Sequence, residues 1–374
     1  MNAHKVLFLA DPHSIHDVKW IKGVMEHHVA AFIVRRSIHI TNGDLVNVTD
    51  CGNISDFSIF RPLHTLYSML KLKNIIKKNN IDILHIMYAE PNALWSLVAY
   101  FTQIKIVISC RGTDILKAIP EFFNNRKIHR AYISFLYKKA FAKAQAITGT
   151  SISQLQSIER LFGKVNSYLI RTGIDIKSVD CTNNDNLPTK LKNKQYVFFP
   201  RNMKPLYNHE FAIEAINLLN QNVLNEYSFV FIDSNSNDQA YVQLIEKKMQ
   251  CSKASYTFLP RLNARQLYAV YKKSSLVVMT PISDGSPVSA MEAMAFEKPL
   301  ILGPLEYDED IFSKIEKLQS WDANQLAEAM TRCLNNDYTL KLENRRIIEK
   351  KANRKREMSR VMEVYNALSN DGIL

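Results

Sequence analysis

Short apolar runs alternate with amphipathic stretches along nearly the whole chain. The first half holds runs too short for buried helices and rich in β-branched residues, which predict strands at 5–10, 29–34, 81–87, 104–109 and 146–150. Between them, stretches such as 14–25 and 66–78 place apolar residues at helical spacing. Strands that alternate with helices in this way predict an α/β fold, with a parallel sheet covered on both faces.

The same alternation restarts after a polar stretch, with predicted strands at 196–199, 229–232, 256–259 and 276–279. A chain of 374 residues exceeds one typical core, so two domains are expected. We predict a Rossmann-like N-terminal domain over 1–178, a linker at 179–193, a Rossmann-like C-terminal domain over 194–350, and a C-terminal helix at 351–374 that packs back on the first domain. Two doubly wound domains in tandem would face a central cleft, which the carboxyl ends of the strands border.

The stretch 276–295 combines a buried strand, a tight loop and a helix. Ser286 is the expected N-cap of this helix and Pro287 its first residue, where a missing N–H costs nothing. Backbone N–H groups at a helix start above a strand end suit an anion, above all a phosphate. Two carboxylates, Asp284 and Glu292, flank this position. From the residues alone, an ordinary strand–helix unit stays open as the alternative.

Arg201 and Lys204 lie on the loop after the first strand of the second half, which should face the same cleft. Two cations beside a helix N-terminus make a site for a diphosphate. A departing diphosphate gains negative charge, which fixed cations stabilise without a metal. Two ordinary surface cations are the alternative.

The formal net charge of +12 indicates attraction to polyanions, such as an anionic membrane surface. The segment 121–144 interleaves lysines and arginines with aromatic residues, and no acidic residue follows Glu121 before Glu159. Such a helix suits an anionic membrane interface, although it could also pack its aromatics inward and solvate its lysines. No apolar run reaches about 18 residues and no signal peptide is recognisable, so we expect a cytoplasmic protein that is peripheral at the inner face of the cytoplasmic membrane. The five cysteines are scattered along the chain, which is typical of reduced thiols in a cytoplasmic protein.

Several kinds of chemistry are disfavoured. The chain has no G-x-G-x-x-G after its first strand, no P-loop and no nucleophile elbow. His13 and His16 have a metal-binding spacing but no third ligand nearby, and the acidic turn 308–310 is better explained as a solvated loop. We therefore expect no metal and no resident cofactor.

The residues 284–299, read as Asp-x7-Glu followed by Ala-Met-Ala and Lys-Pro, resemble the retaining family-4 glycosyltransferases of GT-B fold. The family has Glu where this chain has Asp284. Further segments also resemble parts of the family. Residues 201–205 resemble its phosphate-binding pair, and residues 170–175 resemble its exit from the first domain. Residues 259–268 resemble its nucleotide-base segment, and residues 82–86 and 111–114 resemble its acceptor-facing loops.

The resemblance implies a role for each matching residue. Asp284 would bond the donor sugar and Glu292 the ribose, while Arg201 and Lys204 would hold the diphosphate. The remaining donor-binding residues would be Gly285, Ser286, Pro287, Val288, Ser289 and Arg261. The acceptor-side residues would be His85, Arg111, Asp114 and His16.

The resulting hypothesis is a metal-independent retaining glycosyltransferase that moves a sugar from a nucleoside-diphosphate-sugar to a glycan or lipid-linked acceptor. The resemblance implies bacterial surface polysaccharide synthesis, such as lipopolysaccharide or capsule. One alternative is a GT-B nucleotide-sugar epimerase. Another is a non-catalytic basic binding protein, although no nucleic-acid recognition module is visible.

Overall fold

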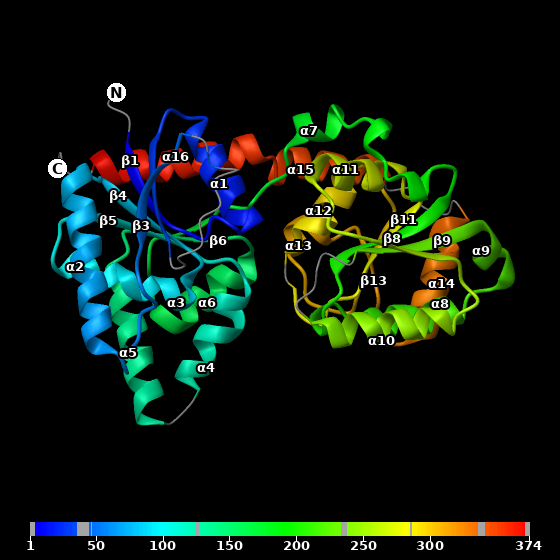
Figure 1. Ribbon diagram of the computed structural model, residues 1–374, viewed down its shortest axis with the longest axis horizontal. Helices are drawn as coiled ribbons and strands as arrows, with labels where there is room; N and C mark the ends of the chain where they lie inside the picture. The colour runs from blue at the N-terminus through cyan, green and yellow to red at the C-terminus, as the bar shows by residue number, and fades with distance from the viewer. Residues whose placement is uncertain are drawn as a thin grey trace. The chain divides into compact units, whose positions relative to one another are not determined.

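We describe the fold from a computed structural model, which describes residues 4–35, 45, 47–124, 127–232, 238–284, 286–335 and 341–370. The chain divides into two compact units (Figure 1). The first unit is formed by Met1–Thr172 together with Arg354–Leu374, and the second by Gly173–Asn353.

The first unit contains a sheet of seven parallel strands in the order β3-β2-β1-β4-β5-β6-β7. Its strands are β1 (Lys5–Leu9), β2 (Ala30–Arg35), β3 (Thr49–Asn53), β4 (Ile83–Met87), β5 (Lys105–Ser109), β6 (Ala146–Gly149) and β7 (Ser167–Leu169). The strand order reverses between β1 and β4, where Leu7 pairs with Leu84. In doubly wound sheets, ligands bind outside the strand ends at this switch point.

Helices cover both faces of this sheet. They are α1 (Ile15–Met25), α2 (Pro62–Asn79), α3 (Ala89–Asn92), η1 (Ala93–Tyr100), η2 (Asp114–Ala118), α4 (Ile119–Phe123), α5 (Ile128–Ala142), α6 (Ile152–Phe162) and α16 (Arg354–Asn370). The core on one face includes residues of α2, η1, α5 and α6, and the core on the other face is formed with α1 and α16. The predicted basic helix over 121–144 is therefore wrong as a single element, since α4 ends at Phe123 and α5 begins at Ile128.

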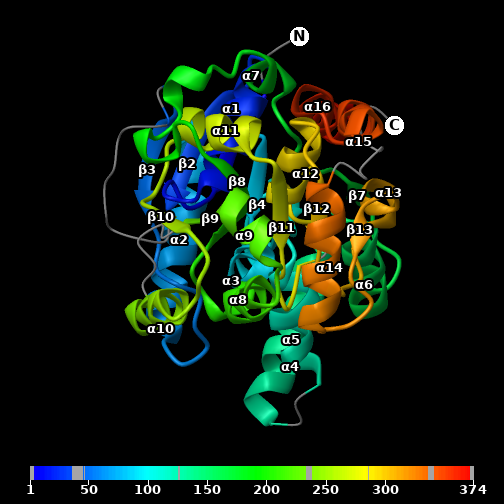
Figure 2. The same ribbon diagram turned by 90° about the vertical axis from the view of Figure 1, so that its right-hand side faces the viewer.

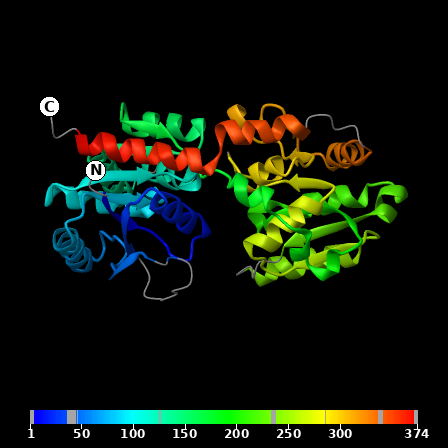
Figure 3. The ribbon, with the colours of Figure 1, turned by 90° about the horizontal axis from the view of Figure 1, so that it is seen from above.

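The last helix of the chain, α16, belongs to the first unit and packs against α1. Its side chains Met358, Val361 and Tyr365 are buried in the same core as the α1 residues Trp20 and Ile21. Figure 3 shows α16, in red, running along the sheet of this unit. The helix begins at Arg354, three residues after the predicted start of the terminal helix at 351.

The second unit repeats the doubly wound design with six parallel strands in the order β10-β9-β8-β11-β12-β13. They are β8 (Gln195–Asn202), β9 (Tyr227–Ile232), β10 (Tyr256–Leu259), β11 (Leu276–Met279), β12 (Leu300–Leu302) and β13 (Glu316–Lys317). The order reverses between β8 and β11, where Val277 pairs with Phe198. The loops that leave β8 and β11 therefore start from neighbouring strands.

Helices cover both faces of the second sheet as well. They are α7 (Ile176–Asp180), η3 (Asn184–Asn186), η4 (Thr189–Leu191), η5 (Pro205–Tyr207), α8 (His209–Asn217), α9 (Gln221–Glu226), α10 (Gln239–Gln250), α11 (Ala264–Lys273), α12 (Val288–Ala295), α13 (Glu309–Phe312), α14 (Ala323–Leu334) and α15 (Lys341–Lys351). One core includes residues of α11, α12 and α15, and the other includes residues of α8, α10 and α14. Figure 2 shows α14 beside the strands of this unit.

The polar stretch predicted as a linker, 179–193, lies within the second unit. It forms the end of α7 and the short helices η3 and η4. Its few apolar residues, Val179, Leu187 and Leu191, are buried in the core beside α11 and α12, which explains why this stretch packs as part of the unit. The predicted linker is therefore wrong, because the many Asn and Asp residues drew attention away from these three buried apolar residues.

Candidate functional site

The candidate site of the second unit is built on the two strands at its switch point. Strand β8 carries Arg201 near its end, next to Pro200. The pairing of β8 with β9 shifts register between Phe199 and Asn202. A proline cannot donate to the strand ladder, and a bulge of this kind re-aims the side chains beside it. Arg201 is thus placed at an irregular strand end.

The Arg201 guanidinium connects the two loops. Its Nη2 lies 3.3 Å from Oδ2 of Asp284, on the loop after β11. Its Nη1 lies 3.3 Å from Oγ of Ser289, in the first turn of α12. Nη2 also donates to the Tyr207 hydroxyl at 2.8 Å, and the guanidinium lies over the Tyr207 ring at 4.2 Å from its centroid. Arg201 and Asp284 therefore lie side by side, as the sequence predicted.

A buried histidine, His209, hydrogen-bonds the backbone of Arg201. His209, at the start of α8, has its Nε2 3.2 Å from the Arg201 carbonyl oxygen. A carbonyl oxygen only accepts, so Nε2 carries the proton and donates it. Burial lowers the pKa of His209 to about 4, which keeps the ring neutral at physiological pH.

Asp284 is a largely buried carboxylate beside this cation. Burial raises its pKa, while the Arg201 charge and a hydrogen bond from the Ser286 backbone N–H act in the opposite direction. The carboxylate thus has a charged partner and a backbone donor. Gly285, predicted to bind the donor, lies outside the described residues.

Helix α12 begins one residue later than predicted. Pro287 is its N-cap and Val288 its first residue, so Ser286 precedes the cap and gives no capping hydrogen bond. A proline has no capping side chain, which leaves the first N–H groups of the helix without a side-chain acceptor. The start of α12 therefore keeps its capacity for an anion.

Glu292 lies one turn further along α12 and is buried. Its charge contributes to raising the pKa of Tyr271, after the larger effect of burial. The Tyr271 hydroxyl donates to the Ser289 carbonyl oxygen at 3.1 Å. Tyr271 therefore fixes the first turn of α12 beside the predicted ribose-binding carboxylate.

Four buried polar atoms at this site have no hydrogen-bond partner within the part of the chain that the structure describes. They are Nε of Arg201, Nδ1 of His209, Oγ of Ser286 and the hydroxyl of Tyr307. Burial raises the pKa of Tyr307, and the nearby Asp284 charge adds to that rise. Buried polar atoms are normally bonded, so their concentration here indicates a polar ligand with both donors and acceptors.

Lys204 and Arg261 are exposed, and no described contact joins either of them to Asp284. Lys204 precedes η5 and lines a different hollow of about 600 Å³ together with Asp238 and Gln239. Arg261 lies between β10 and α11. The described contacts of the site therefore include Arg201 but neither Lys204 nor Arg261.

In the first unit, Arg111 follows β5 and is nearly buried. Its guanidinium lies over the Trp20 ring at 4.3 Å from the centroid, and Nη2 is 3.8 Å from Oδ1 of Asp17. Its Nε and Nη1 have no hydrogen-bond partner among the described residues. Burial lowers the pKa of Arg111, against the effect of Asp17 and Asp114. Unlike the other predicted acceptor-side residues, Arg111 combines a strand-end position with unpaired donors.

Asp114 has a structural role in place of the predicted ligand-facing one. It is fully buried, and its carboxylate accepts backbone N–H groups of Ala89, Arg111, Gly112 and Ile115 at 2.8–3.1 Å. These bonds oppose the rise in its pKa that burial causes. Asp114 therefore fixes the loop that carries Arg111.

His85 is also a core residue, so the structure contradicts its predicted acceptor-side position. The ring is fully buried in β4, with Nδ1 bonded to the Tyr365 hydroxyl and Nε2 to the Ser109 hydroxyl at 2.7 Å. Both nitrogens are thus occupied by protein groups. Burial, with a smaller effect of Arg111, lowers its pKa to about 3. His16, by contrast, is exposed in the first turn of α1.

Two further findings concern metals and membranes. Over the described ranges, no group of three or more His, Cys, Asp or Glu side chains could hold a metal ion. Among the helices described in the structure, none is long and apolar enough to cross a membrane.

The residues of this site that the sequence analysis did not predict are His209 and three tyrosines. Tyr207 lies six residues after Arg201, a closeness that could have drawn attention to it. Tyr271 occupies an ordinary apolar position of α11, and Tyr307 lies on a loop after β12 with no recognisable motif. Phenol groups in apolar patterns give no local signal of a site.

Comparisons with known proteins agree with this architecture. The family described as "Glycosyl transferase 4-like" matches residues 5–151, and the family described as "Glycosyl transferases group 1" matches residues 182–355. No curated protein matches the chain in sequence.

Solved structures that are similar over nearly the whole chain include the following three. A glycosyltransferase from Rickettsia africae is 14% identical, with a TM-score of 0.76 and coverage of 98% of this chain and 99% of that chain. Anabaena HepE in complex with UDP and glucose is 13% identical, with a TM-score of 0.78 and coverage of 97% and 100%. Sucrose-phosphate synthase from Thermosynechococcus elongatus is 15% identical, with a TM-score of 0.76 and coverage of 98% and 100%. At these identities the likeness establishes the GT-B fold alone.

Proposed function

The chain belongs to the GT-B glycosyltransferases of the glycosyl transferase 4-like kind, and we propose that it is a retaining enzyme that uses a nucleoside-diphosphate-sugar. The observation that carries this proposal is the Arg201 guanidinium, which contacts Asp284 and Ser289 at the start of α12. One cation thus lies beside a carboxylate that can bond sugar hydroxyls and beside a helix start that can bind phosphate.

The donor occupies the second unit in this proposal. Arg201 and the first N–H groups of α12 hold the diphosphate, and Asp284 accepts hydrogen bonds from the sugar. Glu292, buried in the second turn of α12, bonds the ribose hydroxyls. Lys204 and Arg261, both exposed, contribute only at the rim.

The chemistry follows from these charges. The bond between the anomeric carbon and the diphosphate oxygen breaks, and the leaving group takes the electron pair. Arg201 stabilises the charge that develops there, which allows departure without a metal. The acceptor hydroxyl oxygen bonds to the same face of the anomeric carbon, and its proton passes to the departing phosphate oxygen, so the configuration is retained.

The donor is proposed to be a UDP-sugar, because the similar Anabaena HepE is solved in complex with UDP and glucose. The acceptor is proposed to be a glycan or lipid-linked intermediate of surface polysaccharide synthesis, met at the inner face of the cytoplasmic membrane. The cationic segment 121–144 supports this acceptor, because its lysines and arginines suit an anionic membrane surface.

A donor panel tests the proposal. The slow hydrolytic release of nucleoside diphosphate is measured with UDP-, GDP- and other activated sugars, for the unaltered protein, Arg201→Met and Glu292→Gln. Removing one preorganised donor from a developing oxyanion costs roughly 100- to 1,000-fold in turnover, which is the loss expected for Arg201→Met. Arg332→Met, an exposed arginine of α14, is the matched control and should keep full turnover.

Three outcomes would count against parts of the proposal. If the unaltered protein neither binds nor hydrolyses any donor, the transferase assignment fails. If Arg201→Met and Glu292→Gln keep full turnover with the best donor, the site is elsewhere. An inverted anomeric configuration in the transfer product would refute retention, and a donor converted to another sugar without an acceptor would indicate an epimerase.

A further inference from the structure

The first unit carries an apolar groove of about 500 Å³ that the donor site does not use. It lies between α2, η1 and α5, and Figure 1 labels α2 and α5. Its lining includes Leu66, Met69, Leu97, Phe101, Tyr132 and Leu136. One charged residue, Lys139, lies among the residues that line it.

Helix α2 has two apolar stripes, of which only one is needed for the core. Met69, Leu72 and Ile76 are buried against the sheet. A second set at i, i+3, i+4 and i+7 is at least half exposed and consists of Leu63, Leu66, Tyr67 and Leu70. A surface helix of a monomeric protein ordinarily presents polar residues there, so the outer stripe is unusual.

Helix α5 has the same feature. Tyr137, Ala140 and Phe141 are buried, while Ile128, Tyr132 and Phe135 follow at i, i+4 and i+7 and are at least half exposed. Leu66 of α2 and Tyr132 of α5 both line the groove, so the two outer stripes border the same hollow. The groove thus joins exposed apolar residues of two helices, and an exposed apolar surface of this kind on a soluble protein marks an interaction site.

The charged residues of the two helices that border this surface have one sign. No acidic residue occurs from 57 to 81 or from 122 to 158, the segments that contain α2 and α5. Helix α2 alone holds Lys71, Lys73, Lys77 and Lys78. Lys143 lies over the Tyr100 ring at 4.1 Å and Lys139 over the Phe135 ring at 5.4 Å, so cations border the groove. The exposed Asp56 precedes the lining residue Phe57, so the border is predominantly cationic. An apolar groove with such a border matches an anionic lipid bilayer.

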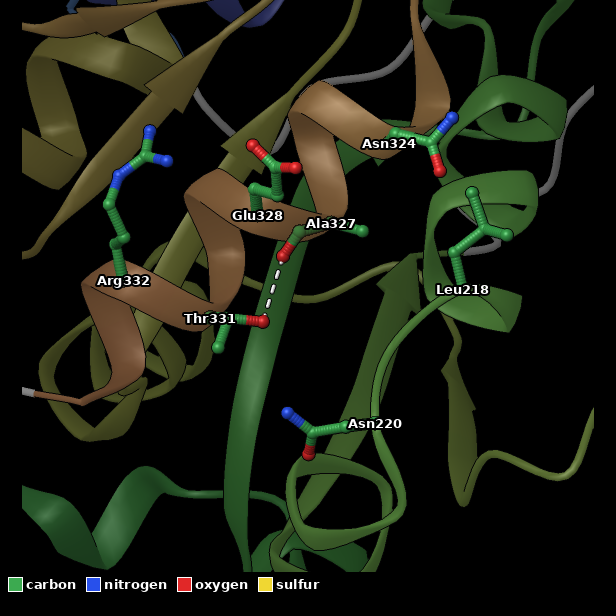
Figure 4. A pocket seen from close by; sticks show the side chains of 7 residues that line it. All are labelled: Leu218, Asn220, Asn324, Ala327, Glu328, Thr331 and Arg332. Atoms are coloured by element: carbon green, nitrogen blue, oxygen red, sulfur yellow. Dashed lines mark hydrogen bonds between the residues drawn. The ribbon is translucent and has the colours of Figure 1, made fainter.

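A hollow of similar volume in the second unit shows what an ordinary surface depression contains. It measures about 530 Å³ and lies between α8 and α14 (Figure 4). Its lining is largely polar and includes Glu328 and Arg332, which carry opposite charges. Leu218 lines it and is 52% exposed, close to the 53% of Leu66 in the first unit. This pair of leucines provides a matched comparison.

We infer that the groove between α2 and α5 receives acyl chains of anionic phospholipids and so docks the first unit on a bilayer. This inference rests on the proposed binding to an anionic membrane. It assigns that binding to a defined apolar groove between two helices. Lysines at the border bind headgroup phosphates, while Leu66 and Tyr132 lie among the chains.

The test measures partition of the full chain onto vesicles of phosphatidylglycerol and phosphatidylcholine, with phosphatidylcholine vesicles for comparison. The groove variant is Leu66→Ser with Tyr132→Ser, and the charge variant is Lys139→Gln with Lys143→Gln. Loss of two inserted side chains should weaken partition at least tenfold at every salt concentration. The charge variant should weaken it several-fold at low salt, with a smaller effect at 0.5 M salt. Leu218→Ser should partition like the unaltered protein.

A tryptophan reporter supplies a second measurement. Leu66→Trp fluorescence should be quenched by phospholipids brominated in the acyl chain, more strongly than that of Leu218→Trp, after subtraction of the signal of the unaltered protein. Such quenching requires depth in the bilayer, which surface attraction alone does not give.

The outcomes separate this inference from the proposed function. If the groove variant partitions like the unaltered protein and the reporter is not quenched, attraction is purely electrostatic and the acyl-chain seat is overturned. If the unaltered protein binds neither vesicle type, the membrane proposal falls as well. A groove variant that changes oligomeric state without any vesicle binding would show a second copy of the chain as the occupant. Donor hydrolysis should be unchanged in the groove variant, so the donor site is judged separately.

Discussion

Lowering the pH from 7.5 to 5.0 is expected to destabilise the first unit through one buried histidine. His85 is fully buried and bonded through both ring nitrogens, to Tyr365 and Ser109. Its pKa is about 3 in the folded chain, against an ordinary value of 6.5. The unfolded chain therefore takes up a proton at a pH where the folded chain does not.

The sign and size follow from linkage. Because the folded-state pKa is depressed, the stabilising contribution is fully present above pH 6.5 and is lost as the pH falls towards the folded value. Between pH 7.5 and 5.0 the unfolded state gains nearly one proton at this histidine, and the free energy of unfolding falls by about 2 kcal/mol. Buried carboxyl groups with raised pKa values, such as Asp17 and Glu357, act in the opposite direction, so the effect must be isolated by comparison.

The assay uses urea unfolding followed by tryptophan fluorescence. The chain has three tryptophans, of which Trp20 and Trp95 lie in the first unit. A Trp321→Phe background therefore makes the signal report on that unit alone. His85→Gln keeps hydrogen-bonding capacity but does not titrate, and His64→Gln, at an exposed position of α2, is the matched control.

The pH-dependent drop should be smaller by about 2 kcal/mol in His85→Gln than in the background protein, and unchanged in His64→Gln. Equal drops in all three proteins would refute the reasoning. That result would mean that the imidazole is protonated in the folded chain or that the first unit opens around it.

Three further outcomes are expected from the first unit. Tyr365→Phe removes the hydroxyl partner of His85 and should lower the free energy of unfolding by about 1–3 kcal/mol at pH 7.5, measured in urea; an unchanged value would mean that Nδ1 finds another partner. Asp114→Asn replaces one acceptor oxygen by an amide that faces backbone N–H groups, so these amides should exchange hydrogen faster and stability should fall by about 2–4 kcal/mol, whereas unaltered exchange would contradict the loop-fixing role. Gly23→Ala places a Cβ 2.6 Å from Cγ of Met358 and should cost about 1 kcal/mol despite the better helix former, with the cost relieved in a double variant that also carries Met358→Ala.

The central strands could be predicted from the sequence because parallel strands in the middle of a sheet are apolar on both faces. The runs around β1, β4, β8 and β11 met this condition and were located to within a few residues. Four strands were missed, the edge strands β3, β7 and β13 and the interior strand β12. An edge strand with solvent on one side needs no apolar run, and the apolar run of β12 is only three residues long. The sequence Thr-Asp-Cys-Gly-Asn of β3 has no strand signal at all.

The candidate site was predictable to the extent that topology determines it. Arg201 lies near the end of β8 and Asp284 follows the neighbouring β11 at a switch point, so the doubly wound pattern could anticipate that the two residues lie close. Their separation of 3.3 Å comes from the structure. The position of His85 could not, because the hydroxyl that binds its Nδ1 belongs to Tyr365, 280 residues away. A histidine in an apolar strand gives the same local pattern whether it faces a ligand or a core.

The membership of α16 in the first unit has a consequence for biosynthesis. The core beside α1 is incomplete until Met358 and Tyr365 have left the ribosome, after the whole of Gly173–Asn353. At ordinary translation rates this delay is on the order of 10 to 40 s, long enough for the second unit to fold first. During this delay the nascent first unit has an exposed apolar sheet face, to which we expect chaperones to bind. A chain truncated after Asn353 should resist limited proteolysis in its second unit and be cleaved throughout its first.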